Sequence, residues 1–147
     1  MNGLGSYMSQ SSRSSASSRL TVLLIDDNPA DLQSWSNALR VCSPGYSILE
    51  ASSVERGLAL CRTEKVDCVV LDLDFPEASG FQVLCELIPD RERPSIAVVV
   101  LTRLVYLALH EMVMHHGAQA CLTKHSTSPR MLDKAIQKAV ATVTSMR

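Results

Sequence analysis

The stretch of sequence that decides the fold is residues 68–80, which read Cys-Val-Val-Leu-Asp-Leu-Asp-Phe-Pro-Glu-Ala-Ser-Gly. Its first four residues are apolar, as in a strand that is buried on both faces of a parallel sheet. The run ends at Asp72, and Pro76 and Gly80 follow at regular intervals. An acid at the carboxyl end of a buried strand, followed by a tight loop, is how an open α/β sheet builds a site. We therefore predict that Asp72 is a nucleophile that accepts a phosphoryl group.

Length and composition limit the class of protein. The chain has 147 residues, which favours one domain, and 46% of them are hydrophobic, enough for a sizeable core. A net charge of -1 gives no bulk attraction to nucleic acid or acidic lipid. No apolar run approaches the roughly 18 residues of a membrane span, and the N-terminus lacks the apolar core of a secretory signal. These features predict a cytoplasmic protein without nucleic-acid or membrane partners.

Residues 1–19 differ in composition from the rest of the chain. Eight of them are serine, and few are large apolar groups. Such a segment buries too little surface to offset its ordering entropy. We predict a disordered tail or linker over residues 1–19 and one folded domain over residues 20–147.

The cysteines and histidines indicate no further site. No two cysteines form a C-x-x-C pair, and His115, His116 and His125 do not have the spacing of a known zinc site. Cysteines within apolar runs are expected to be reduced and to pack as small hydrophobes.

From residue 20 onward, strand and helix signals alternate five times. Apolar runs predict strands at residues 22–25, 46–49, 66–71, 96–101 and 118–122. Helical spacing predicts a helix after each strand, including helices at about 80–88 and 103–116. Asn28-Pro29, Ser52 or Ser53, and Ser128-Pro129 are capping signals. Alternation with nearly all-apolar strands predicts a parallel sheet that helices cover on both faces.

Four of the five predicted strands end in a polar group. Asp26 and Asp27 follow the first strand, Asp72 the third, Thr102 the fourth and Lys124 the fifth. In a parallel sheet these ends lie along one edge, where an open sheet forms its ligand crevice. We therefore expect these side chains to converge on one site.

Three carboxylates in one site require a cation. Two unit charges about 4 Å apart repel by roughly 4 kcal/mol at an effective dielectric constant near 20, so unpaired acids would take up a proton. Oxygen ligands and an arriving phosphate favour Mg²⁺. Phosphoryl transfer needs mainly alignment and charge stabilisation. Lys124 can supply a second cation, and Thr102 a hydrogen bond to a phosphoryl oxygen.

Residues 20–145 resemble the receiver domain of two-component response regulators. The matching residues are Asp26-Asp27, Asp72 with Pro76 and Gly80, Thr102, Gly117-Ala118 and Lys124. The resemblance implies a flavodoxin-like (βα)5 three-layer sandwich with strand order 2-1-3-4-5. It also implies that Asp72 takes phosphate from a phosphohistidine of a sensor histidine kinase or histidine phosphotransfer protein. Such a domain is not an enzyme beyond its own phosphoryl transfer and dephosphorylation.

The same resemblance implies a role for each site residue. Asp26, Asp27 and Asp72 would hold Mg²⁺ together with the backbone carbonyl of Asp74. Thr102 and Lys124 would contact the phosphoryl group and shift the face made by the fourth helix, fifth strand and fifth helix.

Three residues depart from the family's pattern. His125 follows Lys124 where the family usually has a proline in a cis bond. Because a non-proline cis bond costs about 2.5–4 kcal/mol, this bond is either trans or strained. Cys121 stands where the family often has an aromatic switch residue, so a ring rotation cannot carry the signal. Arg103 follows Thr102 where the family usually has alanine or glycine, and its guanidinium either hangs over the site or points to solvent.

The predicted fourth helix begins with an unusually apolar stretch, residues 104–109. Two interpretations are open: the helix packs more deeply than usual, or it forms a surface for a partner or a homodimer.

Two other functions are compatible with parts of the sequence. The Asp72-Leu73-Asp74 motif also resembles haloacid-dehalogenase-type phosphatases, but in those enzymes the nucleophile strand comes first. A receiver-like module could instead bind proteins without phosphorylation. The chain could also be the receiver segment of a longer regulator or hybrid histidine kinase.

Overall fold

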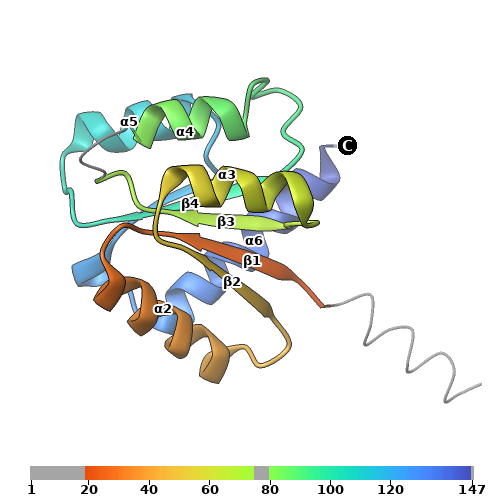
Figure 1. Cartoon of the computed structure of the whole chain (residues 1–147). Helices are drawn as coiled ribbons and strands as arrows, with labels where there is room; N and C mark the ends of the chain where they lie inside the picture. Colours follow the sequence, from red (N-terminus) through yellow and green to blue (C-terminus); the bar gives the residue numbers. More distant parts are fainter. Residues whose placement is uncertain (1–18, 75–79, 147) are drawn as a thin grey trace, which may run out of the picture.

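The computed structural model in Figure 1 is a five-stranded sheet with helices on both faces. It describes residues 19–74 and 80–146. Except for Arg19, the predicted tail lies outside the described residues, and so does Pro76. Within the described ranges, no helix has the length and apolar character that crossing a membrane requires.

The elements alternate as predicted. The strands are β1 (Thr21–Ile25), β2 (Ser47–Ala51), β3 (Cys68–Leu71), β4 (Ala97–Thr102) and β5 (Ala120–Thr123). The helices are α2 (Pro29–Cys42), α3 (Val54–Thr63), α4 (Gly80–Leu87), α5 (Leu107–His115) and α6 (Pro129–Ser145), with a 3-10 turn, η1 (Lys124–Ser126), after β5. The strand order is β2-β1-β3-β4-β5, and all neighbours are parallel. The predicted flavodoxin-like sandwich is thereby confirmed.

Side-chain caps begin three of the helices. The Asn28 side chain accepts a hydrogen bond from Asp31 N, and Ser53 and Ser128 cap α3 and α6 in the same way. Each such cap stabilises its helix by about 1 kcal/mol. The cap at Asn28 also directs the first turn of α2, and with it Asp31, toward the carboxyl ends of the strands.

The strands divide the core into two layers, because alternate side chains point to opposite faces. Leu23, Val69 and Val98 pack on one face against α3, α4 and α5. Val22, Val70 and Val99 pack on the other face against α2 and α6. Figure 1 shows α3, α4 and α5 above the sheet and α2 below it, while α6 runs behind the strands. Nearly all-apolar strands are required because both faces are covered.

The helix predicted over residues 103–116 begins later than expected, at Leu107. Tyr106 is its N-cap residue and makes no side-chain cap hydrogen bond, so no capping signal marks the start. Residues 103–106 form a loop instead, and the Thr102 hydroxyl accepts a hydrogen bond from Leu104 N. The apolar pattern continues from the loop into the helix, which is why spacing alone placed the start too early.

Deep packing of this segment, one of the two interpretations, is wrong for its central residues. Val105, Tyr106 and Leu107 are all exposed.

Gly80 is required by close packing beside the acid-bearing loop. A Cβ atom added at Gly80 would lie 2.6 Å from Leu73 Cα and 2.8 Å from Leu73 O. Backbone atoms cannot yield as a flexible side chain can, so we expect Gly80→Ala to lower the free energy of unfolding by about 1–3 kcal/mol. Denaturant unfolding measures the change. Gly45→Ala is the matched control, because nothing lies within 4 Å of its added Cβ; equal losses in both variants would contradict this account.

Candidate functional site

Adjacent strands bring two of the predicted acids together. Asp26 follows β1 and Asp72 follows β3, and these strands pair in parallel with Ile25 opposite Leu71. Asp72 N donates a hydrogen bond to Ile25 O at 3.0 Å, which continues the ladder to the acid itself. Carboxylate oxygens of Asp26, Asp27 and Asp72 all lie within 4.8 Å of one another. The acid pair after β1 and the distant Asp72 therefore form one cluster.

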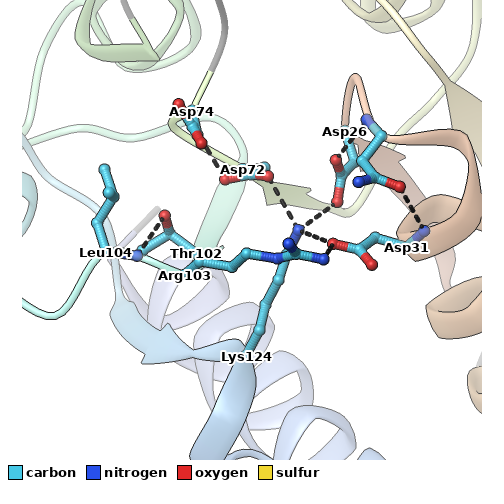
Figure 2. Close-up of polar contacts among 9 residues, drawn as sticks. Asp26, Asp31, Asp72, Asp74, Thr102, Arg103, Leu104 and Lys124 are labelled. Atoms are coloured by element: carbon cyan, nitrogen blue, oxygen red, sulfur yellow. Dashed lines mark hydrogen bonds and ion pairs between the residues drawn. The ribbon is translucent and has the colours of Figure 1, made fainter.

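Lys124 binds this cluster from the end of β5. Its Nζ donates hydrogen bonds to Asp26 Oδ2 at 2.7 Å, Asp31 Oδ2 at 2.9 Å and Asp72 Oδ2 at 2.9 Å, as Figure 2 shows. The side chains are 7% exposed for Lys124, 9% for Asp26 and 6% for Asp72. At this burial the charges are poorly hydrated and depend on one another for compensation.

The pKa values of the site reflect this competition between burial and pairing. Burial raises the pKa of Asp26, although the hydrogen bond from Lys124 opposes the rise. Burial alone would lower the pKa of Lys124, but its hydrogen bonds to the three carboxylates outweigh that effect and raise it. The hydrogen bond from Lys124 lowers the pKa of Asp31. Lys124 therefore stays charged, and burial makes the ionised form of Asp26 less favourable, which a further cation would offset.

Asp31 belongs to the site, although the sequence interpretation missed it. It lies in the first turn of α2, five residues after Asp26, and faces Lys124 (Figure 2). The sequence does contain one indication of this role. Asp31 lies in the first turn of a helix, and the N-cap of that helix, Asn28, directly follows Asp26 and Asp27. Helix starts commonly carry such acids for capping and dipole reasons, so this signal did not distinguish a site residue.

The other predicted residues occupy the same edge. Asp74 N donates a hydrogen bond to Asp72 Oδ1 at 3.1 Å, and its own side chain is exposed. Thr102 is fully buried as the last residue of β4, opposite Thr123 of β5, which precedes Lys124. Its hydroxyl is bonded to Leu104 N at 3.2 Å. The Asp74 backbone N–H thus orients the Asp72 carboxylate. Thr102 and Lys124 come from the ends of the neighbouring strands β4 and β5.

The three departures from the family's pattern have distinct outcomes. Arg103 reaches across the site, and its Nη2 lies 2.7 Å from Asp31 Oδ2. The Lys124–His125 bond is trans, since the described residues contain no cis peptide bond. Cys121 is half-buried and packs against the core layer beneath α3, α4 and α5.

The site opens into a hollow of about 690 Å³ at the carboxyl ends of the strands. Its lining consists of Asp27, Asn28, Pro29, Ala30, Asp31, Asp72, Asp74, Arg103 and Lys124. The acid cluster fits a hard divalent cation, because it offers several carboxylate oxygens and no nitrogen or sulfur ligand. The arrangement can therefore hold a cation and an anionic group side by side.

A family model for the response regulator receiver domain matches residues 22–137. The chain belongs to this family. The match contains the whole acid cluster as well as Thr102, Arg103 and Lys124. It confirms the resemblance on which the sequence interpretation relied.

Curated relatives agree with this assignment. The chain is similar to the polar-differentiation response regulator DivK of Brucella ovis, with 25% identity over 113 residues, 77% of this chain and 90% of DivK. It is 33% identical to PilH of Pseudomonas aeruginosa over 81 residues, 55% of this chain and 65% of PilH. It is 38% identical to the transcriptional regulatory protein GlrR of Escherichia coli over 81 residues, 55% of this chain but only 17% of GlrR.

Solved receiver domains have the same fold. A CheY-like receiver domain protein from Methanospirillum hungatei has a TM-score of 0.76 at 24% identity, covering 88% of this chain and all of that one. A receiver domain from Clostridium thermocellum has a TM-score of 0.75 at 27% identity, covering 87% of this chain and 99% of that one.

Proposed function

We propose that this receiver domain accepts a phosphoryl group on Asp72 from a phosphohistidine of a sensor histidine kinase or histidine phosphotransfer protein. One observation carries the proposal: Asp26, Asp27 and Asp72 form one cluster at the carboxyl edge of the sheet, and Lys124 pairs with Asp26 and Asp72 there. Alignment and charge stabilisation are the main requirements of phosphoryl transfer. A nucleophile, a cation site and a fixed ammonium group meet them.

In the proposed reaction, an Asp72 carboxylate oxygen attacks the phosphorus atom of the donor. The new O–P bond forms as the P–N bond breaks, and the electron pair of the P–N bond stays on the imidazole nitrogen of the donor. The hydrogen bond from Asp74 N holds Asp72 in a fixed orientation. Lys124 neutralises charge at Oδ2, and the Thr102 hydroxyl would turn from Leu104 N toward a phosphoryl oxygen.

Asp26, Asp27 and Asp72, with the backbone carbonyl of Asp74, are the proposed Mg²⁺ ligands. When bound, Mg²⁺ would offset negative charge on the transferring group. Lys124 already pairs with Asp26 and Asp72, so this side chain shares the acids with the cation.

The proposed output surface is the face made by α5, β5 and α6. Thr102 and Lys124 connect it to the site, because they end β4 and follow β5. Cys121 stands in place of the aromatic switch, so we propose that movement of the β4–α5 loop and η1, next to Thr102 and Lys124, carries the signal. We further propose residues 20–147 as the receiver domain, residues 1–19 as a tail or linker, a cytoplasmic location and no separate enzymatic activity. Membership in a longer regulator or hybrid kinase remains an alternative arrangement.

Exposed apolar side chains at the start of α5 favour a homodimer on this face. Val105, Tyr106 and Leu107 are exposed side by side in the chain, and clustered exposed apolar groups mark interaction sites. Sedimentation velocity with Mg²⁺ and beryllofluoride, a phosphoryl mimic, should show a dimer that Leu107→Ser weakens at least about tenfold. Val41→Ser, at an exposed position of α2, is the control. A monomer at high concentration, with and without the mimic, would contradict the dimer.

Labelling with acetyl phosphate tests the proposed function. The chain should acquire one phosphoryl group in the presence of Mg²⁺, and EDTA should suppress the label because the acid cluster then lacks its cation. Absence of label from acetyl phosphate and from every histidine kinase would favour the alternative, a protein-binding module that works without phosphorylation.

A further inference from the structure

Arg103 has a place in the site that the proposed chemistry leaves unexplained. It extends from the β4–α5 loop to α2 and lies beside the Lys124 side chain (Figure 2). Its partner atom, Asp31 Oδ2, is the same oxygen that accepts a hydrogen bond from Lys124 Nζ. One carboxylate oxygen therefore holds two cationic groups at the rim of the hollow.

This shared oxygen places the guanidinium within reach of Asp72. Arg103 Nη2 lies 2.7 Å and Lys124 Nζ 2.9 Å from Asp31 Oδ2, so the two nitrogens are separated by no more than the sum of these distances. Lys124 Nζ in turn lies 2.9 Å from Asp72 Oδ2. A phosphoryl group on Asp72 would project into the hollow that Arg103 lines, which brings its oxygens toward the guanidinium.

Asp31 is suited to hold Arg103 only while Asp72 carries no phosphoryl group. It lies outside the cluster of Asp26, Asp27 and Asp72 that can hold a cation. The Arg103 side chain is 52% exposed, so solvent screens its pair with Asp31 and the pair is weak. A phosphoryl group carries more negative charge than one carboxylate, and its oxygens match the fork of a guanidinium. The exchange of Asp31 for a phosphoryl oxygen is therefore favourable.

We propose that Arg103 is a phosphoryl-binding residue of this domain, and that Asp31 is a positioning residue that holds it at the rim until Asp72 is phosphorylated. The inference rests on the proposed function of Asp72. It adds a second cationic contact to Lys124 and uses a residue that stands where the family has a small one. Arg103 would stabilise the phosphorylated state and pull the β4–α5 loop toward the site.

Beryllofluoride binding to the full chain tests this proposal. Trp35 is the one tryptophan in the sequence and lines a small hollow with Asp26 and Asp72, so its fluorescence reports on the site. With Mg²⁺ present, Arg103→Gln should raise the Kd of beryllofluoride about tenfold, the effect of losing a charge-assisted hydrogen bond. The Kd of Mg²⁺ alone should stay the same or fall, because Arg103 contacts none of the three cluster acids.

Two further variants test the positioning role of Asp31 and provide a control for the loss of a surface arginine. Asp31→Asn should lower the Kd of beryllofluoride, because it frees Arg103 from its resting partner. Arg40→Gln is the matched control: Arg40 also forms an exposed ion pair, with Glu50, and its side chain is 47% exposed. It should leave the Kd within about twofold, as expected for a remote surface pair.

The outcomes distinguish this inference from the function on which it rests. Equal Kd values for wild type and Arg103→Gln would overturn the role of Arg103 while leaving phosphoryl acceptance intact. If Arg103→Gln reacted more slowly with acetyl phosphate but bound beryllofluoride with an unchanged Kd, Arg103 would act in donor recognition. That result would also overturn its proposed role in binding the phosphoryl group. Failure of the wild-type chain to bind beryllofluoride with Mg²⁺ would overturn both proposals.

Discussion

Replacing Asp72 with asparagine should abolish labelling by acetyl phosphate while leaving the domain folded. An amide nitrogen is not a nucleophile toward phosphorus, so the label should fall to background. The amide oxygen can still accept the hydrogen bond from Asp74 N that orients Asp72. Lys124 keeps Asp26 and Asp31 as partners, so its charge remains paired. Removing one of three crowded carboxylates also relieves repulsion within the cluster.

Mass spectrometry of the intact chain measures the label, and circular dichroism verifies the fold. The control is Asp90→Asn, because Asp90 lies before β4, at the opposite edge of the sheet, and its side chain accepts a hydrogen bond from Glu92 N. This control should label like the wild type. If Asp72→Asn carried as much label as the wild type, the acceptor would be another residue.

Replacing Lys124 with glutamine should have the largest effect on stability. Lys124 pairs with three carboxylates, and two of them are almost completely buried. Removing the only cation that contacts Asp26 and Asp72 among the described residues leaves buried charge uncompensated. The free energy of unfolding in EDTA should fall by about 3–5 kcal/mol. Mg²⁺ should restore much of this loss, because it can compensate the same acids.

Denaturant unfolding with and without Mg²⁺ measures both effects. The control is Lys134→Gln, at an exposed position of α6, which should change stability by no more than about 0.5 kcal/mol. Labelling of Lys124→Gln should also slow strongly, because the phosphoryl group loses a fixed cation. A variant as stable as the wild type in EDTA would show that the three ion pairs do not hold the cluster together.

The sheet could be predicted because its determinants are local. Most strands are short apolar runs that end where a polar group or a cap begins, as β1 does before Asp26 and Asn28. Burial on both faces removes the alternation that would otherwise complicate a strand assignment. Prediction failed at the start of α5, where apolar residues continue from loop to helix and Tyr106 provides no cap.

The convergence of the site was also predictable, because parallel strands place their carboxyl ends along one edge. Asp26, Asp27, Asp72, Thr102 and Lys124 could therefore be grouped before any distance was known. Asp31 could not, since an acid in the first turn of a helix has several ordinary roles. Its membership depends on the angle at which the Asn28 cap starts α2 and on the reach of Lys124 from another strand.

Residues 68–80 thus determine locally that a buried strand delivers Asp72 to a loop, and the order of strand ends determines which groups meet it. Only the packed structure decides how the charges pair. Ion pairs depend on distances between side chains from separate elements, and burial makes those distances matter. Tertiary structure added Asp31 to the acids that Lys124 contacts, and it directed Arg103 to Asp31 instead of solvent.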